Sequence, residues 1–346
     1  MVTTIHISDV RYFKTCRQLW DFTSSLRQNL EPRVPNRHLS GGTGFHRALE
    51  RYYQPEEPFN APATMEVFSS WRSKDWAEFL ALEPDEEQIT EYLALADTIE
   101  AVLKHYLSWA PSHDKFIPLG TELKFQIPLL EYNGLPVVYE GKADGLCQTK
   151  DKRFWLMEHK TCASYPQMDL LFLDEQCTSY QWAASEDPNF ADTQPIGTIY
   201  TFALKRVPSI PRLLKNGQLS KDKSIRTTAG VYATEIERQG LVLADYIDIL
   251  ADLEERGNEF FQRVAIQRPE GALAVFESDL HSVVEDMLAS PYIYPSPNWW
   301  ACKTCAFRVP CSMVLNSIDP EPYLQANYQR RHSQEPEDVA EEEESI

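Results

Sequence analysis

The segment LMEHK, residues 156–160, places an acid and a base at a spacing that suits chemistry on a β-strand. Successive side chains of a strand point to opposite faces, so Glu158 and Lys160 share one face while His159 lies on the other. A carboxylate beside a lysine can bind a divalent cation and orient or deprotonate a water molecule. The segment therefore predicts metal-assisted hydrolysis, with a solvent-exposed Glu–Lys pair as the plain alternative.

Two further carboxylates are predicted to meet this pair across neighbouring strands. A turn at Asn133-Gly134 would place Asp144 opposite position 123, within one residue of Glu122. A second turn near position 150 would place Asp144 opposite position 157, within one residue of Glu158. Like charges about 5 Å apart destabilise a sheet unless something positive lies between them. Hard oxygen ligands suit Mg²⁺ or Mn²⁺, so the pattern predicts a metal centre that hydrolyses phosphodiester bonds.

Three other polar residues carry weaker signals. His46, in the expected helix GTGFHRALERYY, shares a helical face with Leu49 and Tyr53, which by itself indicates a packed or surface histidine. Gln176 and Tyr180 lie one helical turn apart and so on one face, a spacing that is often only surface. None of these three residues would be singled out without the Glu158–Lys160 pair.

Three cysteines, Cys302, Cys305 and Cys311, fall within ten positions of the segment NWWACKTCAFRVPC. A thiolate site that holds zinc or iron is usually four-coordinate, so a fourth ligand is required. Cys147, Cys162 and Cys177 lie close to the sheet motifs, whereas Cys16 is remote from them and is the best candidate. Three unrelated buried thiols are the plain alternative. The neighbouring aromatic residues would either pack around the cluster or lie beside a nucleic-acid strand: Trp299, Trp300 and Phe307.

The elements that must position these residues change in blocks along the chain. Residues 8–110 are expected to be mostly helical, and residues 119–162 to form three sequential antiparallel strands. A helix is expected over 174–186, a further buried strand over 195–206, and a long helix over 233–267. This order predicts an α/β protein with a central mixed sheet flanked by helices.

Composition and charge bound the function. No signal peptide or membrane-spanning stretch is visible, and seven cysteines in an unexported chain suggest reduced thiols, so a cytoplasmic protein without a membrane partner is expected, encoded by a host or a phage. The net charge of −19 argues against a nucleic-acid partner, but seven acids lie in residues 335–346 alone. Residues 205–226 carry seven Lys or Arg against one Asp, which favours contact with a polyanion or an ordinary solvated loop about equally.

The order of these motifs resembles the PD-(D/E)XK nuclease superfamily in its RecB-like branch, over about residues 8–315. The resemblance rests on a helical histidine, a glutamate, G-x-A-D-G, E-H-K and Q-x-x-x-Y, at the following positions: His46, Glu122, Asp144, Glu158, Lys160, Gln176 and Tyr180.

The resemblance implies a restriction-endonuclease-like core and a role for each residue. His46, Asp144, Glu158 and the backbone carbonyl of His159 would bind Mg²⁺ or Mn²⁺. Lys160 would be catalytic, with Gln176 and Tyr180 orienting water, lysine or DNA, and Glu122 would act through a water molecule. Ala143 stands where the family often has proline, a departure common in this branch.

Iron-sulfur members of the same group, of the AddB type and among CRISPR-associated nucleases, resemble this chain in having one cysteine before the core and three after it. The resemblance implies that Cys16, Cys302, Cys305 and Cys311 hold a [4Fe-4S] cluster that clasps the two ends of the nuclease, although four thiolates suit Zn²⁺ as well. It also implies an exonuclease rather than an endonuclease, acting on DNA ends or single strands, with a helicase or recombinase partner. A nuclease-like module that binds DNA or a helicase without cutting is the alternative.

The expected organisation follows from these motifs. It has five parts: an N-terminal helical region at 1–115, the nuclease core at 116–206, a basic loop at 207–228, C-terminal helices with the three-cysteine segment at 229–320, and an acidic disordered tail at 321–346.

Overall fold

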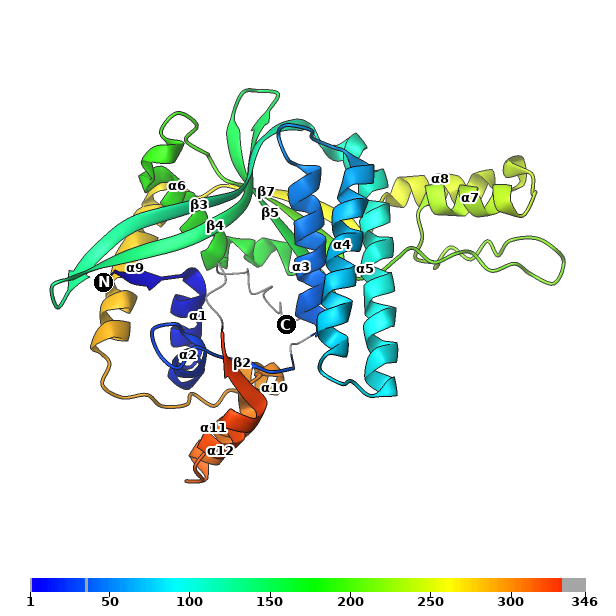
Figure 1. Ribbon diagram of the computed structural model, residues 1–346. Helices are drawn as coiled ribbons and strands as arrows, with labels where there is room; N and C mark the ends of the chain where they lie inside the picture. Colours follow the sequence, from blue (N-terminus) through cyan, green and yellow to red (C-terminus); the bar gives the residue numbers. More distant parts are fainter. Residues whose placement is uncertain (1, 35–36, 332–346) are drawn as a thin grey trace.

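The computed structural model describes residues 2–34 and 37–331 of the chain (Figure 1). Within these residues the centre is one mixed six-stranded sheet with helices on both faces, which confirms the predicted fold class. The strands of this sheet are β1 (Thr3–Ile5), β3 (Phe116–Tyr132), β4 (Leu135–Thr149), β5 (Phe154–Cys162), β6 (Thr198–Leu204) and β7 (Phe261–Ile266).

Strand β4 organises the sheet because it pairs on both of its edges. One edge carries β3, antiparallel along nearly its whole length. The other edge is shared by β1, which is parallel to β4, and β5, which is antiparallel. Strand β6 then runs parallel to β5, and β7 antiparallel to β6. Every residue of β6 is buried, as its sequence TIYTFAL predicts for a strand covered on both faces.

The long β3–β4 hairpin closes at the predicted turn. Asn133 and Gly134 both have positive φ, 51° and 76°, as a tight two-residue hairpin turn requires. An irregularity between Pro128 and Leu130 then shifts the pairing by one residue. The expected partner of Asp144 on β3 was Leu123, but the shift instead pairs Leu123 with Ala143.

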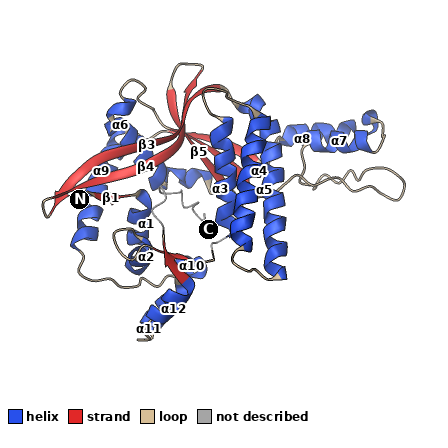
Figure 2. Ribbon diagram, viewed as in Figure 1, coloured by secondary structure: helices blue, strands red, loops and turns tan. Residues whose placement is uncertain are grey.

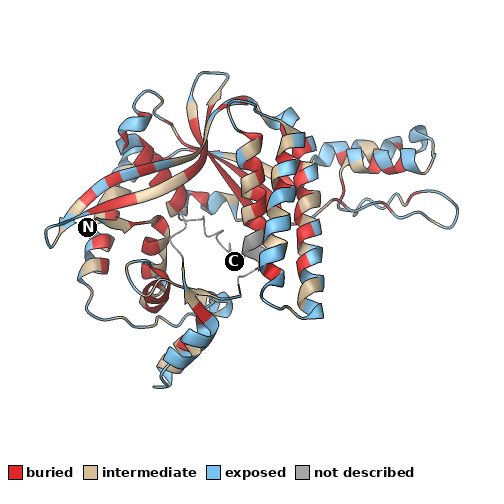
Figure 3. Ribbon diagram, in the orientation of Figure 1, coloured by how far each residue is buried: buried red, intermediate tan, exposed pale blue. Residues whose placement is uncertain are grey.

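Two groups of helices cover the two faces of the sheet (Figure 2). The first group packs on the face that carries Met157 and Phe261, and consists of α3 (Arg37–Tyr52), α4 (Ala61–Leu80) and α5 (Glu86–His113). The second group packs on the face that carries Leu146 and Leu156, and consists of α1 (Ile7–Thr15), α6 (Glu175–Glu186) and α9 (Glu270–Ala289). Buried positions concentrate in the sheet and on the helix faces that meet it (Figure 3).

An arm projects from the body beyond α5 (Figure 1). It consists of α7 (Ala229–Arg238), the short helix η3 (Leu243–Tyr246), α8 (Ile247–Arg256) and the irregular basic loop that precedes them. The arm has a small apolar cluster of its own: Leu219, Tyr232, Ile236, Tyr246, Ile249 and Leu253. The expected long helix over 233–267 was wrong, because Gly240 and Gly257 adopt positive φ and end α7 and α8, and Phe261–Ile266 forms β7.

A second small unit joins the two ends of the described chain. It contains α2 (Arg17–Thr23), α10 (Trp299–Thr304), α11 (Arg308–Leu315), α12 (Glu321–Asn327) and a two-stranded sheet of β2 (Leu30–Pro32) and β8 (Tyr328–Arg330). The expectation of a disordered tail from residue 321 was therefore wrong for 321–330, and the strongly acidic residues 335–346 lie outside the described part. The remaining short helices are η1 (Met168–Leu173) and η2 (Pro188–Phe190).

Two consequences for the expected organisation follow. The region 1–115 is not only helical, since it supplies β1 to the central sheet and β2 to the small sheet. The sheet itself reaches outside 116–206, because β1 and β7 belong to it. In the described residues, no helix combines the length and the apolar character that crossing a membrane demands.

Candidate functional site

The predicted site lies where β4 and β5 separate. Their ladder ends at the pair Gly145–Met157, so the next position places Asp144 across from Glu158, on the same face. Beyond that point Asp144 takes over the ladder bond, because the His159 N–H donates to Asp144 Oδ2 at 2.6 Å. The N–H and C=O of one strand residue point to the same edge, so the His159 carbonyl also faces this fork. The register thus brings Asp144, Glu158 and the His159 backbone together as the sequence predicts.

A chain of buried polar contacts leads from Glu158 to α6. Lys160 Nζ lies 3.3 Å from Glu158 Oε1 and donates to Gln176 Oε1 at 2.6 Å. Gln176 Nε2 in turn donates to the Tyr180 hydroxyl at 3.0 Å. All four residues are buried, with the Lys160 side chain only 10% exposed. Lys160 is therefore held in a fixed place between a carboxylate and an amide.

Helix α6 presents Gln176 and Tyr180 because of its start and its packing. Its N-cap, Asp174, accepts a hydrogen bond from the Cys177 N–H at 2.8 Å, which fixes the first turn. Gly141, the first glycine of the G-x-A-D-G motif, lets the Phe125 ring and α6 approach β4 closely. A Cβ atom added there would lie 2.4 Å from the Phe125 ring and 3.4 Å from Tyr180 Cε1.

His46 approaches the same fork from α3. Its Nδ1 lies 3.6 Å from Asp144 Oδ1, and its ring meets that of His159 edge-on at 6.4 Å between centroids. Burial opposes ionisation of Asp144, but His46 and the His159 N–H offset this effect and hold the pKa of the carboxyl well below its usual range. Burial lowers the pKa of the His159 imidazole to about 3, so that ring is neutral at physiological pH.

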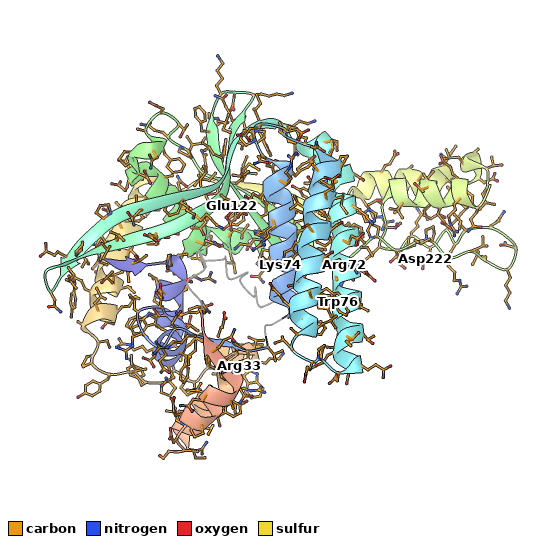
Figure 4. All side chains as sticks on the ribbon, in the orientation of Figure 1. Arg33, Arg72, Lys74, Trp76, Glu122 and Asp222 are labelled. Carbon is orange, nitrogen blue, oxygen red and sulfur yellow. The ribbon has the colours of Figure 1, made fainter. Side chains whose placement is uncertain are left out.

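Glu122 differs from the other predicted residues. It adopts a left-handed backbone, with φ of 52°, between Thr121 and Leu123, which pair with Gly145 and Ala143. Its carboxylate forms an ion pair with Lys142 on β4. Figure 4 places it near the middle of the molecule, between the β3–β4 hairpin and helices α3 to α5. A non-glycine residue at positive φ costs energy and often marks a functional position.

Sequence reasoning missed a buried polar network behind His159. The Tyr53 ring stacks on the His159 ring at 5.3 Å with 6° between the planes. The Tyr53 hydroxyl lies 2.6 Å from that of Tyr106, and both hydroxyls accept from Arg263 at 3.3 Å. Arg263 also donates to Asp114 at 2.8 Å, and the network therefore ties α3, α5 and β7 to the strand that carries the site.

The signals for this network were weak in the sequence. Tyr53 follows His46 by seven residues, two helical turns on one face, which could have linked it to the site. Arg263 could not be found, because its strand was expected to be helical and its partners lie at least 62 residues away in sequence.

The four predicted cysteines lie in the small unit at the chain ends. Cys16, Cys302, Cys305 and Cys311 are half-buried there, whereas the other three cysteines are buried elsewhere. Burial, reinforced by the thiols of Cys16, Cys305 and Cys302, raises the pKa of the Cys311 thiol to about 11. The four thiols are thus close enough to influence one another electrostatically.

The neighbouring aromatic residues divide into two kinds. Phe307 is buried and stacks between Phe22 and Tyr328, at 5.1 and 4.8 Å. Trp299 and Trp300 are instead 82% and 68% exposed. The expectation that all three pack around the cysteines holds only for Phe307.

Neither predicted metal centre is drawn into ligand geometry. In residues 2–34 and 37–331, no group of three or more His, Cys, Asp or Glu side chains is placed to hold a metal ion. The side chains at the fork contact N–H donors and the lysine, and the thiols neighbour one another. Both sites thus bring together the chemical types of ligand without closing around a metal.

Comparisons with known proteins agree with the motif order. The sequence matches the family described as "PD-(D/E)XK nuclease superfamily" over residues 5–312. No protein of curated function matches it. A solved structure titled "Crystal structure of SSO0001" aligns with 89% of this chain and 84% of its own, at a TM-score of 0.34 and 12% identity. A likeness of that size carries no argument about function.

Proposed function

The chain belongs to the PD-(D/E)XK nuclease superfamily, and from this premise we propose that it is a metal-dependent deoxyribonuclease that hydrolyses phosphodiester bonds. The observation that carries the proposal is the buried arrangement of Asp144, Glu158 and Lys160 at the β4–β5 fork. Burying two carboxylates and an amine in one place is costly, and such groups cluster at functional sites.

The proposed cation is Mg²⁺ or Mn²⁺, held by Asp144, Glu158, the His159 carbonyl and His46. The donor set fits, because two carboxylates and a carbonyl supply hard oxygens and one imidazole is acceptable to Mn²⁺. When bound, the cation supplies a Lewis acid that polarises the phosphodiester and lowers the pKa of water.

Lys160 is the proposed catalytic base or charge stabiliser. Its ammonium group is held by Glu158 Oε1 and Gln176 Oε1, which fixes its direction before substrate arrives. A fixed cation at the place where phosphate charge develops stabilises the transition state without reorganisation. Gln176 and Tyr180 are proposed to position Lys160, and Glu122 to act through a water molecule.

We further propose an exonuclease that acts on DNA ends or single strands, with a helicase or recombinase as partner, in the cytoplasm. The absence of disulfides among the seven cysteines, all of them in the described residues, supports a reducing compartment. The family alone does not separate exonuclease from endonuclease, and a substrate with one blocked end distinguishes them. Degradation from the open end supports the exonuclease, and internal cuts in a closed circle contradict it.

The four neighbouring thiols are proposed to hold a [4Fe-4S] cluster that fastens the small unit. Soft thiolate donors fit iron or zinc, and the mutual influence of the thiols on the Cys311 pKa supports their nearness. Metal analysis and the absorption spectrum of anaerobically purified protein distinguish iron from zinc. Loss of the metal is expected in Cys311→Ala but not in Cys162→Ala, whose thiol lies in another buried cluster.

The basic loop is proposed to contact the phosphate backbone. Lys223 is engaged by Asp252 at 3.2 Å, whereas Arg212 and Lys215 are exposed near the loop tip. Replacing Arg212 and Lys215 by glutamine is expected to flatten the salt dependence of DNA binding by about 0.7 to 0.9 per lost contact. Lys223→Gln is the matched control, and an equal effect of that control would contradict the proposal.

The nuclease assay tests the function itself. Wild type is expected to degrade a labelled oligonucleotide with Mg²⁺ or Mn²⁺ and to lose activity with chelator. Lys160→Ala and Asp144→Asn are expected to fall by at least about 100-fold, the usual cost of losing a catalytic group. A folded Lys160→Ala protein with wild-type activity would reject the assignment, and a wild type that binds but never cuts would favour the non-cutting module.

A further inference from the structure

The segment between α9 and α11 combines exposed aromatic rings with an unusual charge. Residues 287–318 contain no Asp or Glu, although 52 acids in 346 residues would place about five in a stretch of 32. The same stretch contains Lys303 and Arg308, both exposed. It is therefore a locally positive region on a protein of net charge −19.

Four aromatic side chains of this stretch face solvent. Tyr292 is 76% exposed, Tyr294 50%, Trp299 82% and Trp300 68%. Large aromatic residues are usually well buried on average, so several exposed rings within nine residues indicate a binding surface. We call residues 291–300 the aromatic segment.

The aromatic segment is held in place although its rings are exposed. Asn298 caps α10 by accepting from the Trp300 N–H at 2.9 Å. The Ser296 N–H donates to Cys16 Sγ at 3.3 Å, and the Arg17 guanidinium lies 5.1 Å from the Tyr294 ring centroid. Prolines at 291, 295 and 297 further restrict the backbone. Little conformational entropy would be lost when a ligand stacks on such a surface.

Contacts between elements connect the aromatic segment to the candidate active site. The chain leaves α9 and passes α1 and α2 before it reaches α10 (Figure 1). Cys16, which receives the Ser296 N–H, follows Lys14 by two residues, and Lys14 pairs with Glu175 at the start of α6. Glu175 immediately precedes Gln176, the partner of Lys160.

We propose that the aromatic segment binds single-stranded nucleic acid, with bases stacking on Trp299 and Trp300 and phosphates near Lys303 and Arg308. Aromatic rings beside cations are the pattern that binds single strands without sequence preference. A duplex hides the faces of its bases, so the surface selects unpaired strands or frayed ends. The inference rests on the proposed nuclease function in that the strand held here is the one that reaches Lys160.

The test is binding of a fluorescein-labelled 20-nucleotide oligo(dT), measured by anisotropy in a Lys160→Ala background. Alanine at both Trp299 and Trp300 is expected to weaken binding by at least about 10-fold, and phenylalanine at both to weaken it by less than about threefold. Binding of a blunt-ended duplex of the same length is expected to change less than about twofold. Val275→Ala, which truncates a side chain 61% exposed on α9, is the matched control with no expected effect.

Equal affinity of wild type and the double alanine protein for oligo(dT) would overturn the proposal, as would an equal loss for the duplex. Quenching of wild-type tryptophan fluorescence by oligo(dT), reduced when both residues are phenylalanine, gives a second readout if the alanine protein does not fold. Unchanged quenching would count against the proposal.

The outcomes separate this inference from the proposed function. Wild-type protein that binds oligo(dT) through these residues but cuts nothing with Mn²⁺ upholds the binding surface and rejects the nuclease. Cleavage that does not respond to the double alanine change upholds the nuclease and rejects the surface.

Discussion

The buried network behind His159 makes a quantitative prediction about stability. Arg263→Met is expected to lower the free energy of unfolding by about 3–5 kcal/mol, the cost of removing one partner of a buried ion pair. Asp114 would stay behind with a side chain only 2% exposed. The carbonyl of His113 and the hydroxyl of Thr201 would lose donors now at 3.0 and 3.1 Å. Methionine retains the stem that packs near Trp109, so the effect reports mainly on charge and hydrogen bonds.

Denaturant titration of wild type, Arg263→Met, Asp114→Asn and the double variant measures this effect. The double variant is expected to lose less than the sum of the single losses, by about 0.5–3 kcal/mol, because the two groups interact directly. Arg153→Met is the matched control, since its partner Asp151 is 49% exposed and a surface pair contributes at most about 1 kcal/mol. A loss below about 1 kcal/mol for Arg263→Met, or strict additivity, would refute the reasoning.

Three other predictions concern the site and the small unit. Because folded His159 has a pKa of about 3, stability is expected to fall as the pH drops from about 6.5 towards 3, where the unfolded imidazole takes up a proton; urea titrations should show a shallower decline in His159→Phe. Gly141→Ala is expected to cost about 1–3 kcal/mol in thermal unfolding because its Cβ would meet Phe125, whereas Gly230→Ala, with nothing within 4 Å, should be neutral or stabilising. Cys305→Ala is expected to increase hydrogen exchange at both chain ends more than in the sheet, and uniform exchange would contradict the clasp.

The parts of the fold that the sequence predicted were those with strong local signals. Asn133-Gly134 indicated the hairpin correctly, and the apolar run TIYTFAL indicated a buried strand. Strand β1, with three residues, carries too little pattern to be recognised before its partner β4 is placed. The same applies to β7, whose alternation is short and follows two helices.

The candidate site was predictable in composition but not in register. Counting back from the turn placed Asp144 opposite position 123, and the one-residue shift between Pro128 and Leu130 could not be read from the sequence. The shift moves Leu123 opposite Ala143, and Glu122 takes a left-handed conformation between two paired neighbours. Its partner Lys142 was likewise not anticipated, because the ion pair depends on that shifted register.

Long-range contacts account for what remained out of reach. Arg263 meets Asp114 across 149 residues of sequence, and no local pattern joins them. Stacking of Tyr53 on His159 depends on how α3 lies against the sheet, which helix periodicity alone does not determine.

The most direct test of a metal-dependent site at the β4–β5 fork is the anomalous scattering of Mn²⁺ in crystals grown with that ion. We expect a peak between the carboxylates of Asp144 and Glu158, within ligand distance of the His159 carbonyl, and its loss in Asp144→Asn. Well-ordered crystals of wild type that bind Mn²⁺ elsewhere, or not at all, at concentrations that should saturate the site would contradict the account.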